Sequence, residues 1–164
     1  MDDEWGGLGR VMVGDFRGTR TCRGDGYGVR GEGRFAIREG RVYDWRGSSA
    51  STGRVTPDGP EPSMYAMNYT AGGKKGEQLR MTFDDGAVQQ ISIQPRMRAH
   101  PGTIPVTREQ LEGVLDPLSG AFLTARSANP NGDLSVCNQM LPVFDGRQRF
   151  DLVLKPKKAV RVQN

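Results

Sequence analysis

The chain contains 164 residues, of which 35% are hydrophobic and 23 are glycine, and its formal net charge is +4. This length is enough for one domain with a hydrophobic core, and so much glycine favours turns and short strands over helices. Basic and acidic residues are interleaved, which is typical of an ordinary solvated surface and not of a polyanion-binding face. No run of about 18 apolar residues predicts a membrane-spanning helix, and the acidic residues 1–5 show no secretory signal.

The start of the chain predicts irregular structure. Residues 1–26 are rich in Gly, Arg and Asp, and their apolar residues follow no consistent period. Val11, Val13 and Phe16 suggest at most one short strand. We interpret this segment as a frayed terminus, with an altered beginning of the chain as the alternative. Residues 27–164 are expected to form a single β-rich domain.

The next part of the chain predicts β-strands. Two runs, 27–37 and 41–54, are rich in β-branched and aromatic residues and are separated by a turn signal at Glu39-Gly40. The small residues 47–51 suit a strand that bends or that another element approaches closely. Apolar side chains then alternate with other residues in three further strands of a meander: Tyr65–Tyr69, Leu79–Phe83 and Ile91–Ile93.

The segment Asp84-Asp85-Gly86 is a strong turn signal between the last two of these strands. Asp-Gly accepts the positive φ angles that a type I′ turn requires. The sequence therefore predicts a tight hairpin at this point.

One kinked helix or helix pair is expected over residues 107–127. Thr107 and Gln110 have the spacing of a capping box. Asp116 and Pro117 restart the helix, with Asp116 as the N-cap and Pro117 at the first helical position. Apolar residues recur at helical spacing on both sides of this restart: Leu111, Val114, Leu115, Leu118, Ala121, Phe122 and Ala125.

A second hairpin is predicted near the end of the sequence. Its strands cover residues 140–144 and 148–154, and Asp145-Gly146 forms its turn. Val160 and Val162 suggest one more strand. Because nothing follows that could pair with this strand, we expect the natural protein to continue.

The residues that could carry chemistry are few and scattered. His100 is the only histidine, so a catalytic triad would depend on it alone. Together with the separated Cys22 and Cys137, it cannot furnish a zinc site. Residues 26–31 match the dinucleotide pattern G-x-G-x-x-G, but a strand follows them where the motif needs a helix. We therefore predict no catalytic residues, no metal and no cofactor.

The basic residues near the end of the sequence are the basis of an alternative function, a cytosolic nucleic-acid-binding β-barrel. Such proteins add exposed aromatic residues that stack on bases, whereas the aromatic residues of this chain alternate with polar ones as core residues do. A strand edge protected by lysines is the preferred interpretation, and we expect no nucleic-acid partner. The basic residues are Lys155, Lys157, Lys158 and Arg161.

Two segments resemble a known family. Residues 115–121 (Leu-Asp-Pro-Leu-Ser-Gly-Ala) and residues 141–152 (Leu-Pro-Val-Phe-Asp-Gly-Arg-Gln-Arg-Phe-Asp-Leu) are similar to a helix start and a hairpin of domain-of-unknown-function family 3108. This family is found in alphaproteobacterial envelope proteins. Residues 43–54 also look like its earlier strands, so the resemblance covers roughly residues 27–154.

The resemblance implies a periplasmic protein without enzymatic activity. It also implies a strongly curved antiparallel sheet, an open barrel or β-spiral, wrapped around a helix. Members of the family begin with a signal peptide and continue past this C-terminus with further strands and another cysteine. This chain thus looks like a truncated member in which Cys137 pairs with a residue outside the chain. Whether Cys22 and Cys137 pair with each other stays open.

The leading hypothesis is a non-enzymatic periplasmic envelope protein that acts as an interaction or scaffold module, or that holds a lipid-like ligand. Its expected partner is an envelope protein or that lipid-like ligand, and the sequence leaves the oligomeric state open. The arginines beside the second hairpin turn are expected to pair with carboxylates at the sheet rim. The residues expected to face a ligand or partner are Asp116, Pro117, Ser119, Asp145, Arg147 and Arg149.

Overall fold

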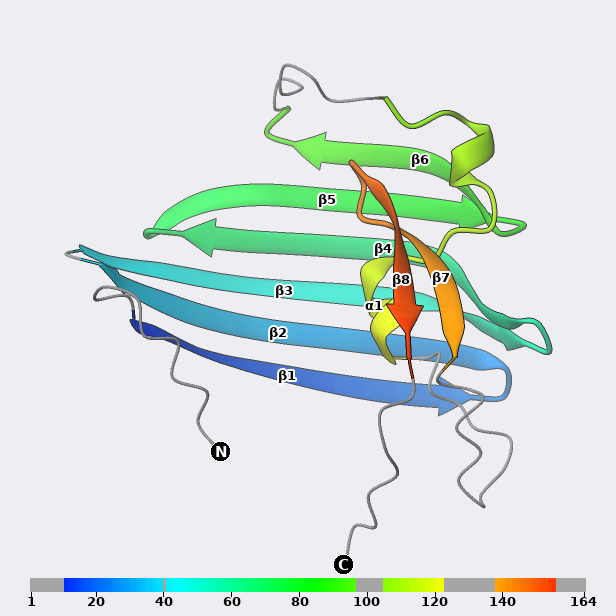
Figure 1. The fold of residues 1–164 in the computed structure, drawn as a ribbon, viewed down its shortest axis with the longest axis horizontal. Coiled ribbons are helices and arrows are strands. Elements are labelled where there is room, and N and C mark those ends of the chain that lie inside the picture. The colour runs from blue at the N-terminus through cyan, green and yellow to red at the C-terminus, as the bar shows by residue number, and fades with distance from the viewer. Residues whose placement is uncertain (1–10, 40, 97–104, 123–137, 156–164) are drawn as a thin grey trace, which may run out of the picture.

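The computed structural model describes residues 11–39, 41–96, 105–122 and 138–155. Within these ranges, six strands form one antiparallel sheet and two more form a hairpin that lies across it (Figure 1). The expected mainly β fold with an open, curved antiparallel sheet is confirmed. Its elements are β1 (Val11–Arg23), β2 (Gly26–Glu39), β3 (Arg41–Thr56), β4 (Gly59–Ala71), β5 (Lys74–Asp84), β6 (Ala87–Gln94), the 3₁₀ turn η1 (Glu109–Leu111), α1 (Pro117–Phe122), β7 (Gln139–Phe144) and β8 (Arg149–Leu154).

The sheet is a meander in which each strand pairs with the next one along the chain. Tight turns make this arrangement possible. Asp85 and Gly86 join β5 to β6 with φ angles of 49° and 71°, as a type I′ turn requires. The hairpin predicted at this point is confirmed. Gly72 and Gly73 join β4 to β5 in the same way, with φ angles of 57° and 72°.

Register shifts bend this sheet. A bulge increases the local twist of a strand pair, and shifts in successive pairs add to one another. The sheet therefore curves but stays open, with β1 and β6 as its two edges. The shifts lie at Thr52/Gly53, Asn68/Thr70 and Thr82/Phe83.

Alternation along the strands gives the sheet an apolar inner face and a polar outer face. In β5, Leu79, Met81 and Phe83 are buried, whereas Gln78 before them and Arg80 between them are exposed. The alternation predicted for this strand is confirmed. An antiparallel sheet of this kind packs one face on the core and leaves the other to water.

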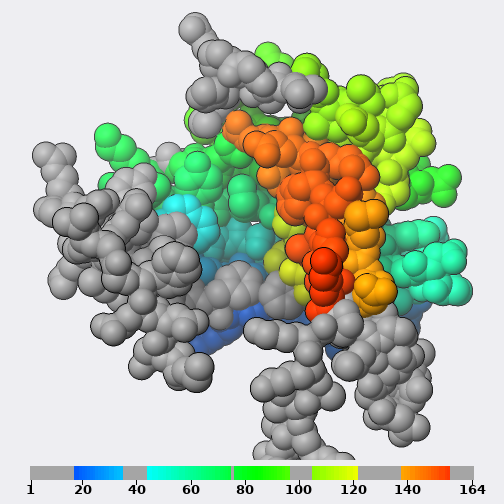
Figure 2. Space-filling model, viewed as in Figure 1, coloured from blue at the N-terminus to red at the C-terminus, as the bar shows by residue number. Residues whose placement is uncertain are grey.

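The core lies between the inner face and the segments that cover it. Helix α1 and hairpin β7–β8 form this cover, and the hairpin lies in front of the sheet in Figure 2. Complete burial of a side chain such as Met81 contributes roughly 1.5–3 kcal/mol of hydrophobic stabilisation. The buried cluster contains residues of the sheet and of its cover: Tyr27, Val29, Tyr65, Leu79, Met81, Phe83, Val114, Leu118 and Phe144.

The N-terminal segment departs from the expected irregular structure. Residues 11–23 form β1, which pairs with β2 along all 13 of its residues. The prediction is wrong here because glycine occupies inner-face positions: Gly18 lies opposite Gly31. Backbone pairing is therefore complete while the alternation of apolar side chains that marks a strand is missing. Residues 1–10 lie outside the described residues.

The helical segment is shorter than predicted and is divided in two. The N–H of Thr107 bonds to the side chain of Gln110 at 2.9 Å, which is half of the predicted capping box. However, Gly113 has a φ of 65° and donates its N–H to the carbonyl of Gly86 at 2.8 Å. This bond ties the chain to the β5–β6 turn, so the helix predicted through Leu115 is wrong there. No helix within the described ranges has the length and apolar character to cross a membrane.

Candidate functional site

Helix α1 begins directly after Asp116, whose side chain caps it. Its Oδ1 accepts the N–H of Leu118 at 2.9 Å and that of Ser119 at 3.1 Å. The backbone carbonyl of Asp116 accepts the N–H of Gly120 at 2.9 Å. Pro117 occupies the first helical position, where its missing N–H leaves no bond unmade. The predicted start of this helix is confirmed.

The other carboxylate oxygen of Asp116 joins the helix to the sheet. Its Oδ2 accepts hydrogen bonds from the hydroxyl of Ser51 on β3 at 2.8 Å and from that of Ser119 at 2.5 Å. The hydroxyl of Tyr27 on β2 lies 2.8 Å from Ser119 Oγ. Because both serines donate their single proton to the carboxylate, Tyr27 donates to Ser119. We call these four residues the Asp116 cluster.

The Asp116 cluster is closed to solvent. Asp116 and Ser119 have no exposed surface, and Ser51 and Tyr27 are 1% and 5% exposed. Burial raises the pKa of the Asp116 carboxyl, against the lowering effect of the hydroxyl and backbone donors. Burial also raises the pKa of the Tyr27 hydroxyl. In this structure Asp116 and Ser119 therefore hold α1 on the sheet and are not open to a ligand or partner.

Ser51 and Tyr27 are members of this cluster that the sequence pattern did not reveal. The small residues 47–51 indicated a close approach, and α1 does pack against β2 and β3. Which hydroxyl meets the helix depends on the register of the strands, where Ser51 lies opposite Val29 and Tyr65. No local motif carries that information.

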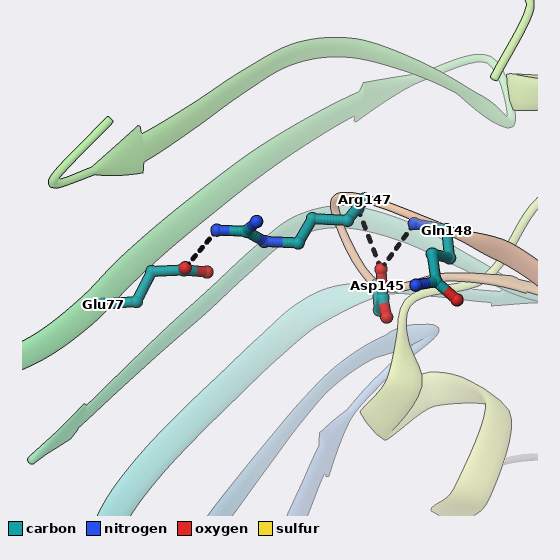
Figure 3. A network of polar contacts seen from close by, with 4 residues as sticks. All are labelled: Glu77, Asp145, Arg147 and Gln148. Atoms are coloured by element: carbon teal, nitrogen blue, oxygen red, sulfur yellow. Dashed lines mark hydrogen bonds and ion pairs between the residues drawn. The ribbon is translucent and has the colours of Figure 1, made fainter. Parts of the chain in front are cut away.

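The turn of hairpin β7–β8 is fixed by Asp145. Its Oδ1 accepts the N–H groups of Arg147 and Gln148, both at 2.8 Å (Figure 3). Gly146 has a φ of 99°, and a Cβ at this position would lie 2.7 Å from Leu79 Cδ1. The predicted Asp-Gly turn is confirmed, and the missing side chain lets its tip lie directly on β5.

Arg147 anchors this turn to the sheet. Its Nη2 pairs with Oε2 of Glu77 on β5 (Figure 3). The Glu77 side chain is 8% exposed and that of Arg147 is 38% exposed, so the ion pair is partly desolvated. Arg149 pairs instead with Asp151 of its own strand, at 3.3 Å. Both arginines pair with carboxylates as predicted, but only Arg147 reaches the sheet.

Backbone hydrogen bonds join the hairpin to the helix. Leu115, the residue before Asp116, donates its N–H to the carbonyl of Pro142 at 2.8 Å and accepts the N–H of Phe144 at 2.9 Å. A Cβ on Gly120 would lie 3.0 Å from a Val143 methyl group, so α1 packs closely on β7. Helix and hairpin therefore cover the sheet as one unit.

The hairpin also presents apolar side chains to solvent. Met140 and Val153 lie opposite one another in the register and are 67% and 54% exposed. Phe150 is 43% exposed. Among the described residues β8 pairs only with β7, which leaves its other edge unpaired. Met140 and Val153 thus form an exposed apolar pair beside an edge of β8 with which no described residue pairs.

Several predicted features fall outside the described residues. These are His100, Cys137, the helical residues 123–127 and the basic residues after Lys155. Cys22 lies on β1 as an exposed free thiol. Within the part of the chain that the structure describes, no group of three or more His, Cys, Asp or Glu residues is placed to hold a metal ion.

Together these features define a β-sheet protein in which a short helix and a hairpin close one face of an open antiparallel sheet. The family model described as "Protein of unknown function (DUF3108)" matches residues 4–163. The chain therefore belongs to this family, and the resemblance noted in its helix start and hairpin is confirmed over nearly the whole chain. No curated protein and no solved structure matches it.

Proposed function

We propose that this chain is a non-enzymatic interaction module of the bacterial periplasm, and that hairpin β7–β8 contacts another protein of the cell envelope. The observation that carries this proposal is the exposed apolar pair of Met140 and Val153. The periplasmic part of this proposal is supported by the motifs at the helix start and in the hairpin, which resemble those of envelope proteins.

The attachment of the hairpin to the sheet supports a binding role. The ion pair of Arg147 with Glu77, the backbone bonds of Leu115 and the contact of Gly146 with Leu79 all hold it in place. A strand edge that is already ordered loses little conformational entropy when a partner binds. A partner strand could pair with the free edge of β8 and cover the apolar pair at the same time.

The work of the buried carboxylates supports a non-enzymatic role. The carboxylate oxygens of Asp116 accept hydrogen bonds from the first turn of α1 and from two hydroxyl groups. The carboxylate of Glu77 forms an ion pair with Arg147. Both groups therefore stabilise the cover of the sheet, and neither is directed toward a substrate.

The packing of the inner face favours a protein partner over a lipid-like ligand held inside the curved sheet. Leu118 of α1 and Phe144 of β7 belong to the same buried cluster as Met81 and Tyr65 of the sheet. The space beneath the cover is thus occupied by the chain's own side chains. We therefore expect a protein partner to contact the outer surface of the hairpin.

Native mass spectrometry of the protein, exported to a bacterial periplasm and purified gently, separates these two ligands. A bare mass with folded charge states is expected for a module that recognises protein. Extra mass that matches a phospholipid or an acyl chain would replace the proposal with a lipid carrier.

Site-specific photo-crosslinking in the source bacterium tests the surface itself. A crosslinker at Val153 is expected to capture a defined envelope protein, whereas the same crosslinker at Thr82, on β5 away from the hairpin, is not. The change Met140→Thr should remove that product, because threonine keeps the preference for strand structure but loses apolar contact area. Equal capture from both positions, or products found only in cytosolic fractions, would contradict the proposal.

A further inference from the structure

The outer face of the sheet carries a continuous row of polar side chains across its strands. The register places one polar residue of each strand in this row, in cross-strand order: Arg17, Glu32, Ser48, Asn68, Gln78 and Gln94. Adjacent strands lie about 4.8 Å apart, so the row is roughly 24 Å long. Asn68 Nδ2 donates to Ser48 Oγ at 3.0 Å, which fixes the middle of the row.

Hollows of the surface follow this row. One, of about 640 Å³, is lined by Arg17, Arg46 and Asn68 among others. The next, of about 310 Å³, shares Asn68 and continues past Gln78 and Arg80. A third, of about 370 Å³, shares Gln78 and ends at Pro95. Neighbouring hollows share lining residues, so a row of shallow, open hollows crosses the strands, and we call this row the groove.

Arginines border this groove. Arg17 and Arg80 form no ion pair with any described residue, and they lie on strands that are four spacings, roughly 19 Å, apart. Arg34 lies directly opposite Arg46 in the register, and both line the first hollow. Arg46 pairs with Asp44, but both side chains are well exposed and such an ion pair is weak. A carboxylate of a ligand can therefore replace Asp44 as the partner of Arg46.

We propose that this groove binds an extended acidic polysaccharide, a linear sugar chain that carries carboxylates. Arginine binds carboxylates in a bidentate manner, and the described lining residues include four arginines but one carboxylate, that of Glu32 opposite Arg17. The neutral Ser48, Asn68 and Gln78 match sugar hydroxyls as donors and acceptors. A single-stranded nucleic acid fits less well, because such ligands need aromatic side chains for stacking and the described lining residues include none. The groove lies on the face opposite to hairpin β7–β8, so this inference does not depend on the proposed role of the hairpin.

The test is titration of the full chain with an oligogalacturonate at low salt, measured by calorimetry. The fully methyl-esterified oligomer is the matched neutral ligand. The acidic oligomer is expected to bind and to weaken as salt rises, because salt screens exposed charges. Absence of binding at low salt, or equal binding of the esterified oligomer, would overturn the proposal.

Variants locate the site. Arg17→Gln and Arg80→Gln are each expected to raise the Kd about 1.5- to fivefold, the usual effect of one exposed charge pair. Arg54→Gln is the control: it removes the same charge, but Arg54 pairs with Glu61 at 2.7 Å and does not line the groove. An equal loss in Arg54→Gln would show general charge attraction and overturn the site.

Competition decides the class of ligand. Polyphosphate and a single-stranded oligonucleotide are expected to bind more weakly than the oligogalacturonate at equal charge concentration. If either binds as tightly, the groove is a general polyanion surface and the assignment to a polysaccharide fails. Hairpin variants such as Met140→Thr should leave sugar binding unchanged, which keeps this test separate from that of the hairpin.

Discussion

A single carboxylate, that of Asp116, connects three parts of the fold. It caps α1 through two backbone N–H groups and reaches β3 through the hydroxyl of Ser51. Through Ser119 it also reaches Tyr27 on β2. A buried charge of this kind is tolerated because donors surround it, and any change that removes it leaves those donors without partners.

Asp116→Ala is therefore expected to lower the free energy of unfolding by about 2–4 kcal/mol, the sum of a lost helix cap and of buried hydroxyls left unsatisfied. Urea denaturation followed by circular dichroism measures this. The control is Asp151→Ala, which breaks the exposed pair with Arg149 and should cost no more than about 1 kcal/mol. Similar losses in the two variants would show that the Asp116 cluster contributes little.

The pH dependence of stability follows from the same residue. Burial raises the pKa of the Asp116 carboxyl in the folded state above its ordinary value of 3.8. At pH values between 3.8 and the raised pKa, the folded state binds more protons than the unfolded state, so the free energy of unfolding falls as pH rises. Above the raised pKa this decrease is complete, because the carboxyl is ionised in both states.

Comparison with Asp116→Asn isolates this effect, since asparagine does not titrate. The stability of the natural protein relative to this variant is expected to fall from acidic to neutral pH. Denaturation curves at a series of pH values provide the measurement. A relative stability that is independent of pH, or that rises with it, would mean that the carboxyl is not desolvated as the structure indicates.

At the scale of elements, the contact between the hairpin turn and β5 depends on a missing side chain. Gly146→Ala places a methyl group against Leu79 in a backbone conformation that alanine avoids. We expect a loss of about 2–4 kcal/mol, the backbone strain plus the steric overlap. Thermal or urea denaturation would measure it.

Gly86→Ala is the matched control for this prediction. Gly86 has a positive φ of 71°, but a Cβ there meets no atom within 4 Å. This variant should therefore lower the free energy of unfolding only through the strain of a positive φ on alanine, about 1 kcal/mol. Equal costs for both glycines would mean that the turn does not press on β5.

Local motifs explain which elements could be predicted from the sequence. The turn at Asp85-Gly86 and the helix start at Asp116-Pro117 depend on neighbouring residues alone. The early end of the first helical segment, at Leu111, could not be predicted from local motifs. It depends on a distant group, the carbonyl of Gly86, which accepts the N–H of Gly113. β1 escaped detection because a glycine-rich strand can pair without showing an apolar face.

The candidate site was predicted only in part, again because local motifs carry no information on distant contacts. The sequence predicted the helix start, the hairpin turn, and that Arg147 and Arg149 pair with carboxylates. Which side of each element is buried follows from how the sheet is covered, so the sequence could not show that Ser119 points inward. Met140 and Val153 were missed because their exposure depends on the same covering arrangement.

At the scale of the whole molecule, protection from hydrogen exchange should follow strand order. β3 and β4 have paired neighbours on both sides, whereas β8 has one free edge among the described residues. Amides of residues 49–53 and 64–68 are expected to exchange only through global unfolding, and those on the free edge of β8 much faster. Exchange measured by mass spectrometry or NMR tests this. Equal protection throughout would show that the free edge of β8 is covered.

The two layers of the molecule also differ in when they can assemble. Every strand of the sheet pairs with its neighbour in sequence. The sheet can therefore form one hairpin at a time, because each pairing closes only a short loop. The bonds that close the cover join residues far apart: Tyr27 and Ser119 are separated by 92 positions, Ser51 and Asp116 by 65. As the chain emerges from its N-terminal end, the apolar face of the sheet can therefore form before the helix that shields it has arrived, and in that interval it offers a chaperone a binding surface.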